Sequence, residues 1–213
     1  MPQPAPHFSQ QPATRVVLVT GAGRGTGRAV AVALGEQDAA VCVNDINPDS
    51  AVETVRLVEA AGGRGKTYLA DVSKKFPVQA MFNAIEDDWG RLGAAVHCAR
   101  VAPRRPILEM DEWEWRRTLD VILTGAFNVL QVGGRVMAAG GGGVVVLVVE
   151  AAGDLAGFGA VEAARRGVVG LGEAVKEEMA GVGVRVEVVI YGAAERARAA
   201  NETVRRIFSP ASR

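Results

Sequence analysis

A glycine-rich turn follows the first apolar run of the chain and precedes its first helical segment. Residues 16–19 are apolar, residues 20–27 read TGAGRGTG, and residues 28–36 have the composition of a helix. Glycines let the backbone turn tightly and let a pyrophosphate approach, and the free N–H groups of a helix N-terminus attract an anion. The turn therefore predicts a strand–turn–helix unit that can hold the phosphates of a dinucleotide.

Short apolar runs alternate with helical segments along the rest of the chain. We expect strands at residues 16–19, 40–43, 67–70, 94–98, 144–149 and 184–190, and helices at 28–36, 50–61, 78–89, 111–139, 161–179 and 195–207. Strands separated by helices imply βαβ units with a parallel sheet. The predicted fold class is therefore α/β: a doubly wound parallel sheet, or Rossmann fold, of six strands with helices on both faces.

Two details of the helices carry their own predictions. Asp49 or Ser50 has the chemistry of an N-cap for the helix at 50–61. Gly133 and Gly134 interrupt the long helical period, and each costs about 1 kcal/mol relative to Ala. The last turns of the helix at 111–139 are therefore expected to be the weakest.

Composition and charge exclude several classes of function. We divide the chain of 213 residues into a flexible leader at 1–14, rich in Pro and Gln, and a single domain at 15–213. Lys and Arg number 24 and Asp and Glu 24, which argues against nonspecific nucleic-acid binding. Cys42 and Cys98 lack a metal-binding spacing, so we expect no metal site and reduced core thiols in a cytoplasmic protein. No apolar run reaches the roughly 18 residues of a membrane span.

An acidic residue, Asp45, ends the second apolar run. A carboxylate at that position can accept both hydroxyls of an adenosine ribose, and it repels a 2′-phosphate. The sequence therefore predicts NAD rather than NADP as the ligand, although Arg24 in the turn weakens this preference slightly.

The spacing Thr-Gly-x-x-x-Gly-x-Gly at residues 20–27 resembles that of the short-chain dehydrogenase/reductases, and the likeness runs from about residue 15 to residue 192. Asp71-Val72 looks like the family's adenine-contacting motif, and residues 119–131 look like its long interface helix. The resemblance implies an NAD site formed by Gly21, Arg24, Gly25, Thr26, Gly27, Asp45, Asp71, Val72 and Ala99.

The residues that catalyse the family's reaction are missing. That reaction is hydride transfer between nicotinamide and a carbonyl or alcohol, with a Tyr as acid/base beside a Lys four residues later, a Ser and an Asn. The two tyrosines of this chain, at 68 and 191, are followed four residues later by Val72 and Glu195, so no Tyr-x-x-x-Lys exists. The positions equivalent to Asn, Ser, Tyr and Lys are Ile122, Glu150, Val161 and Arg165. We therefore identify a degenerate member that lacks the tetrad.

The nicotinamide half of the site also departs from the family. Residues 97–100 read HCAR in place of Asn-Asn-Ala-Gly, residues 191–192 read YG in place of Pro-Gly, and Arg196 falls near a cofactor-contacting Thr. Arg100 either binds phosphate or fills the site. Glu150 and Arg165 occupy positions that face each other in the family, so we predict an ion pair between them. His97 is more simply a strand-end histidine bonded to a backbone group than an acid/base.

Three functions stay open at this point. The first is a pseudoenzyme that keeps part of an NAD(H)-type site. The second is an active NAD-dependent oxidoreductase with a displaced mechanism, in which Glu150, His97 or Tyr191 supplies the proton. The third is a structural or regulatory subunit that binds no nucleotide and pairs with an active relative. In each case the helices at 111–139 and 161–180 are expected to form a homodimer or homotetramer.

Overall fold

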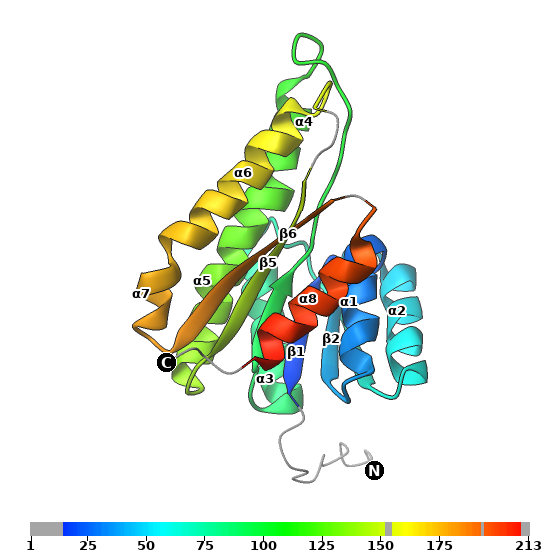
Figure 1. Ribbon diagram of the computed structural model, residues 1–213, viewed down its shortest axis with the longest axis vertical. Coiled ribbons are helices and arrows are strands. Elements are labelled where there is room, and N and C mark those ends of the chain that lie inside the picture. The colour runs from blue at the N-terminus through cyan, green and yellow to red at the C-terminus, as the bar shows by residue number, and fades with distance from the viewer. Residues whose placement is uncertain (1–14, 152–154, 193, 210–213) are drawn as a thin grey trace.

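The computed structural model describes residues 15–151, 155–192 and 194–209, so the predicted leader at 1–14 lies outside the described residues. Six parallel strands form one sheet in the order β3-β2-β1-β4-β5-β6. They are β1 (Val16–Thr20), β2 (Ala40–Asp45), β3 (Arg64–Leu69), β4 (Ala94–His97), β5 (Gly143–Ala151) and β6 (Val184–Gly192). The predicted doubly wound parallel sheet is confirmed (Figure 1).

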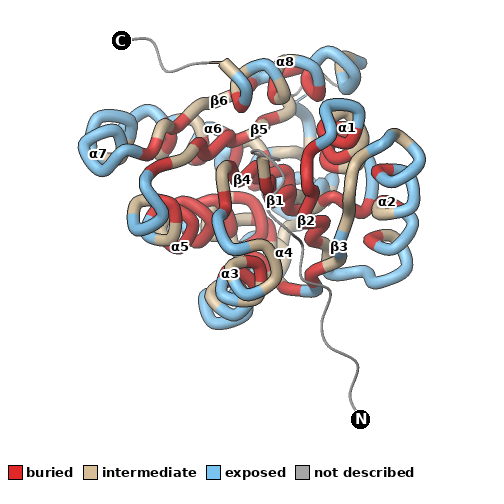
Figure 2. The backbone as a smooth tube through the Cα atoms, turned by 90° about the horizontal axis from the view of Figure 1, so that it is seen from below, coloured by how far each residue is buried: buried red, intermediate tan, exposed pale blue. Residues whose placement is uncertain are grey.

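Helices cover both faces of this sheet. They are α1 (Gly25–Gly35), α2 (Pro48–Ala60), α3 (Lys75–Trp89), α4 (Glu112–Leu119), the π-helical turn η1 (Asp120–Thr124), α5 (Gly125–Ala139), α6 (Gly159–Ala174), α7 (Lys176–Ala180) and α8 (Arg196–Phe208). Val17 and Val19 of β1 pack with α1, α2 and α8 on one face. Leu18 points to the other face, where α3, α5 and α6 form the second core (Figure 2). The central strands are apolar throughout because both their faces are buried.

Several element boundaries differ from the prediction. β3 begins at Arg64 rather than at 67. It is an edge strand and is less buried than the central strands, so it tolerates polar residues that the search for apolar runs did not include. α3 begins at Lys75 rather than at 78, since Pro77 is accepted in a first turn. The N-cap of α2 is neither Asp49 nor Ser50: the side chain of Asn47 accepts a 2.9 Å hydrogen bond from the backbone N–H of Ser50.

The predicted long helix at 111–139 is continuous through α4, η1 and α5. The helix continues through Gly133 and Gly134 to Ala139. A Cβ at Gly133 would lie 2.9 Å from the ring of Phe82, so this glycine lets α3 approach. By length and composition the stretch Glu112–Ala139 could cross a membrane, yet 61% of its most apolar window is buried within the fold. That burial is what a core helix of a globular domain shows.

The strand order reverses between β1 and β4, which both lie in the middle of the sheet. β1 leads through α1 to β2 on one side, whereas β4 lies on the other side. At such a switch point the connections leave in opposite directions and open a crevice at the carboxyl ends of the strands. The fold therefore places a ligand site beside residues 20–27.

Candidate functional site

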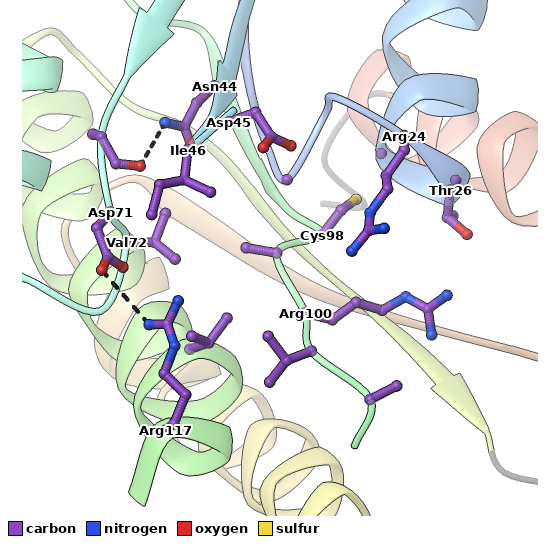
Figure 3. Close-up of a pocket in the computed structure, with 18 of the residues that line it drawn as sticks. Arg24, Thr26, Asn44, Asp45, Ile46, Asp71, Val72, Cys98, Arg100 and Arg117 are labelled. Atoms are coloured by element: carbon purple, nitrogen blue, oxygen red, sulfur yellow. Dashed lines mark hydrogen bonds and ion pairs between the residues drawn. The ribbon is translucent and has the colours of Figure 1, made fainter. Parts of the chain in front are cut away.

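A cavity of about 490 Å³ opens at the carboxyl ends of β1 to β4 (Figure 3). Its wall contains all nine residues of the predicted cofactor site: Gly21, Arg24, Gly25, Thr26, Gly27, Asp45, Asp71, Val72 and Ala99. Three further arginines, Arg100, Arg117 and Arg196, complete its charged lining. The structure therefore brings together residues that lie far apart in the sequence and that were predicted to share one site.

The glycine-rich turn forms one wall because of its backbone conformation. Gly21 and Gly25 have φ values of +61° and +59°, in the left-handed region that side chains disfavour. A Cβ at Gly21 would lie 2.5 Å from the Cα of Ala99, so only glycine lets β1 and the segment after β4 approach this closely. A Cβ at Gly25 would meet no atom within 4 Å, so this position faces open space where α1 begins.

Asp45 is held at the end of β2 by the backbone around it. Its Oδ2 accepts a 2.8 Å hydrogen bond from the N–H of Gly23, and its Oδ1 accepts one of 3.0 Å from the N–H of Asn47. An ionised carboxylate can accept about four hydrogen bonds, so each oxygen keeps capacity for a ligand hydroxyl. Asp45 thus both fixes the turn and presents acceptors to the cavity.

Asp71 lies on the neighbouring wall and is bound by two donors. Its Oδ1 accepts hydrogen bonds from the backbone N–H of Ser73 at 3.0 Å and from the Ser73 hydroxyl at 2.7 Å. Arg117 of α4 lies with Nη1 3.6 Å from Oδ2. Burial alone would raise the pKa of Asp71, but the Ser73 hydrogen bonds and the Arg117 charge outweigh it and hold that pKa below its ordinary value.

A polar network lies behind the cavity wall at Thr26. The hydroxyl of Tyr191 donates to Glu150 Oε2 at 3.0 Å, and Thr26 Oγ1 lies 2.7 Å from the same hydroxyl. Because the only proton of Tyr191 goes to Glu150, Thr26 is the donor in the second bond. Burial, with a smaller contribution from Glu150, raises the pKa of Tyr191 to about 12.

The predicted ion pair between Glu150 and Arg165 is present but long. Arg165 Nη2 lies 3.9 Å from Glu150 Oε1, whereas Arg100 Nη1 lies 2.7 Å from Glu150 Oε2. The side chains of Glu150 and Arg165 are only 11% and 10% exposed, and that of Arg100 is 34% exposed. Arg100 is therefore the main partner of Glu150.

Of the four positions that the sequence analysis equates with the family's tetrad, three are buried and Glu150 is partly buried. Ile122 is 6% exposed, Val161 is fully buried, and Glu150 and Arg165 are enclosed as described above. Among the described residues, none of these four belongs to the cavity wall.

His97 is a buried strand-end histidine, as the sequence suggested. Its Nδ1 lies 3.0 Å from Thr20 Oγ1 and its Nε2 lies 3.3 Å from the carbonyl oxygen of Ile122. Burial lowers the pKa of His97 to about 4, so the ring is neutral at pH 7 and Nε2–H donates to the carbonyl. Within the described part of the chain, no three His, Cys, Asp or Glu side chains are placed to hold a metal ion.

Two features of the site escaped sequence analysis. Arg117 of α4 pairs with Asp71, which follows β3, and the charged residues around Arg117 in the sequence gave no sign of that partner. The bond between Thr26 and Tyr191 joins residues at opposite ends of the chain, and only the sheet order brings them together.

Comparison with known proteins agrees with this geometry. The family model described as short chain dehydrogenase matches residues 15–206. D-threitol dehydrogenase of Mycolicibacterium smegmatis is 34% identical over 177 residues, which cover 82% of this chain and 68% of that protein. (3R)-3-hydroxyacyl-CoA dehydrogenase of Mus musculus is 31% identical over 188 residues, which cover 83% of this chain and 73% of the relative.

A solved structure extends the likeness over nearly the whole chain. A metagenomic short-chain oxidoreductase, crystallised in complex with NADP, superposes with a TM-score of 0.86 at 26% identity. The match covers 93% of this chain and 92% of that one.

Proposed function

This chain belongs to the short-chain dehydrogenase family, and from that premise we propose that it binds NAD(H) without transferring hydride by the family's mechanism. It would then be a pseudoenzyme within a family of oxidoreductases. One observation carries the proposal: all nine residues expected to bind the cofactor line the cavity, while Ile122, Val161 and Arg165 are buried, Glu150 is partly buried, and none of these four belongs to its described wall.

The adenosine half of the dinucleotide fits the residues present. Asp71 offers a carboxylate to the amino group of adenine, and Asp45 offers acceptors to the ribose hydroxyls. The start of α1 and Arg24 lie where a pyrophosphate needs N–H donors and positive charge. The open space beside Gly25 leaves room for that group.

Asp45 favours NAD over NADP, because its carboxylate repels a 2′-phosphate. The metagenomic relative was crystallised with NADP, so the family admits either cofactor. In this chain both oxygens of Asp45 accept backbone N–H bonds, which hold the carboxylate at the end of β2 where it faces the cavity. We therefore propose NAD(H) as the tighter-binding dinucleotide.

Hydride transfer needs a proton donor or acceptor beside the substrate oxygen, and the side chains at the positions equivalent to the family's Asn, Tyr and Lys do not supply one. Val161 and Ile122 carry no exchangeable side-chain proton, and the guanidinium of Arg165 stays protonated. The raised pKa of Tyr191 makes it a poor acid, and its proton is already donated to Glu150. Loss of the general acid alone costs roughly 10²–10⁴-fold in rate.

The test pairs a binding assay with a turnover assay. We expect NADH to bind in calorimetry, binding to weaken about tenfold in Asp45→Ala, and Asp49→Ala, a change at an exposed acid nearby on α2, to bind as wild type. With saturating NADH, a panel of ketones and aldehydes should give no oxidation above the protein-free rate. Turnover that disappears in Glu150→Gln would overturn the proposal and support the displaced mechanism.

The assembly and location of the protein are also proposals. The helices at 111–139 and 161–180 correspond to α4, η1, α5, α6 and α7, and we propose that they pair two or four copies. Light scattering at micromolar concentration should give a dimer or tetramer, and a monomer would overturn this. An active relative is the alternative partner. The buried thiols of Cys42 and Cys98, both without a disulfide, support a cytoplasmic location.

A further inference from the structure

The charges that line the nucleotide cavity are separated between its two ends. Figure 3 shows Asp45, Asp71 and Arg117 on one side of the segment that carries Cys98, and Arg24 and Arg100 on the other side with Thr26. The carboxylates lie where adenine and ribose present hydrogen-bond donors. The phosphate side carries only positive side-chain charge among the described residues that line it.

Two of the cavity's arginines have no side-chain partner in the protein. Within the described part of the chain, Arg24 and Arg196 make no ion pair and no side-chain hydrogen bond, while Arg117 pairs with Asp71 and Arg100 with Glu150. Arg196 is the first residue of α8 and Arg24 precedes the first residue of α1. Unpaired guanidiniums beside a helix N-terminus favour an anion with more charge than the pyrophosphate of a dinucleotide.

Tyr191 and Glu150 back the cavity wall at Thr26 and Arg100, where the family resemblance places the nicotinamide end of a dinucleotide. Thr26 lines the cavity, and its hydroxyl is bound to Tyr191, which is 5% exposed and takes the place of a smaller proline in the family. Glu150, bound by Tyr191, also holds Arg100 at the cavity wall by a 2.7 Å contact. The guanidinium of Arg100 is therefore held at the cavity wall, and we expect it to face the last phosphate of a ligand that is shorter than a dinucleotide.

We propose that this cavity binds an adenine nucleoside diphosphate, with its terminal phosphate at Arg100 and Arg196, more tightly than it binds NADH or ADP-ribose. The inference rests on the proposed function, because it concerns the same cavity and the same adenosine contacts. A diphosphate carries a free terminal phosphate with one more negative charge, and it places no ribose against the Tyr191 network. Charged hydrogen bonds of this kind are the strong ones in such sites.

Calorimetric titration of the full chain with ADP, AMP, ADP-ribose, NADH and inorganic pyrophosphate tests the proposal. We expect ADP to bind about tenfold tighter than ADP-ribose and NADH, and tighter than AMP and pyrophosphate. Arg196→Gln should reduce the preference for ADP over ADP-ribose to less than threefold. The matched control is Arg198→Gln, which alters an exposed arginine on the same helix that pairs with Glu195, and it should keep the preference.

The outcomes separate this inference from the proposed function. If NADH binds as tightly as ADP or more tightly, the terminal-phosphate inference is wrong and dinucleotide binding stands. If AMP binds as tightly as ADP, the terminal phosphate adds no affinity; if pyrophosphate does, the adenosine adds none. In either case the inference also fails. If a sample that is folded by circular dichroism binds none of the five compounds, nucleotide binding itself is refuted.

Discussion

Replacing Glu150 by glutamine tests how the network of Glu150, Arg100, Arg165 and Tyr191 is held together. The side chains of Glu150 and Arg165 are 11% and 10% exposed, so Glu150→Gln leaves the Arg165 guanidinium buried without a counter-charge. Removing one partner of a buried ion pair costs about 3–5 kcal/mol. We expect the lower end, about 3 kcal/mol, because Arg100 is partly exposed to water and a glutamine can still accept the Tyr191 proton.

The converse substitution should cost less. Arg165→Met breaks only the 3.9 Å contact, and Glu150 keeps Arg100 at 2.7 Å and the hydroxyl of Tyr191. We expect a loss of about 1 kcal/mol, comparable to one net hydrogen bond. The signature of the network is therefore an asymmetry, in which the loss for Glu150→Gln is about three times that for Arg165→Met.

Urea denaturation at pH 7, followed by circular dichroism, measures both losses directly. Heating should also lower the Tm of Glu150→Gln by about 6–12 °C, given about 2–4 °C per kcal/mol for a domain of this size. Glu162→Gln is the matched control, because it breaks an exposed i,i+4 pair with Arg166 worth about 0.3–0.5 kcal/mol. Equal and small losses for Glu150→Gln and Arg165→Met, within the range of this control, would refute the network.

Two further predictions concern pH. The pKa of His97 is about 4 in the fold against about 6.5 in the unfolded chain, so the unfolded state takes up the proton first and stability falls as pH drops below about 6.5. His97 should lower the free energy of unfolding by about 2 kcal/mol between pH 7 and pH 5. Urea titrations at the two pH values should show that His97→Asn loses this dependence of stability on pH. If the variant keeps the same dependence, the buried neutral state of His97 is refuted. Asp71 has a lowered pKa, so its stabilisation is present above about pH 4 and is lost as pH falls through the folded value. Asp71→Asn should cost about 1 kcal/mol at pH 7 and less below pH 3 in the same assay, and a difference that does not vary with pH would contradict the role of the carboxylate.

The sheet and the adenosine side of the cavity could be predicted because their signals are local. The apolar run at 144–149 marks a strand buried on both faces, and it became β5. The turn at 20–27 is recognisable in the sequence by its glycines. Gly21 shows why glycine is needed there: its backbone is left-handed, and Ala99 lies too close to leave room for a Cβ. Asp45 ends β2 and Asp71 follows the end of β3, and the ends of parallel strands meet at one edge of the sheet.

The remaining details depended on tertiary packing, which the pattern of residues does not encode locally. The role of Arg100 could not be decided from the sequence, since a long cationic side chain after β4 can bind either a ligand or another residue of the protein. Its partner Glu150 lies on the neighbouring strand, and only the folded sheet shows that the two side chains meet. The edge position of β3 likewise explains why its polar first half escaped an analysis that looked for apolar runs.

The most direct test of the central claim compares the affinity of NADH with that of ADP-ribose by calorimetry on the wild-type chain. Both ligands carry the adenosine and pyrophosphate that we propose the cavity binds, and only NADH carries nicotinamide. If the adenosine side is retained and the nicotinamide side is filled by the Tyr191 network, the two dissociation constants should agree within about threefold. Binding of NADH tenfold or more tighter than ADP-ribose, or no binding of either by the folded protein, would contradict the account.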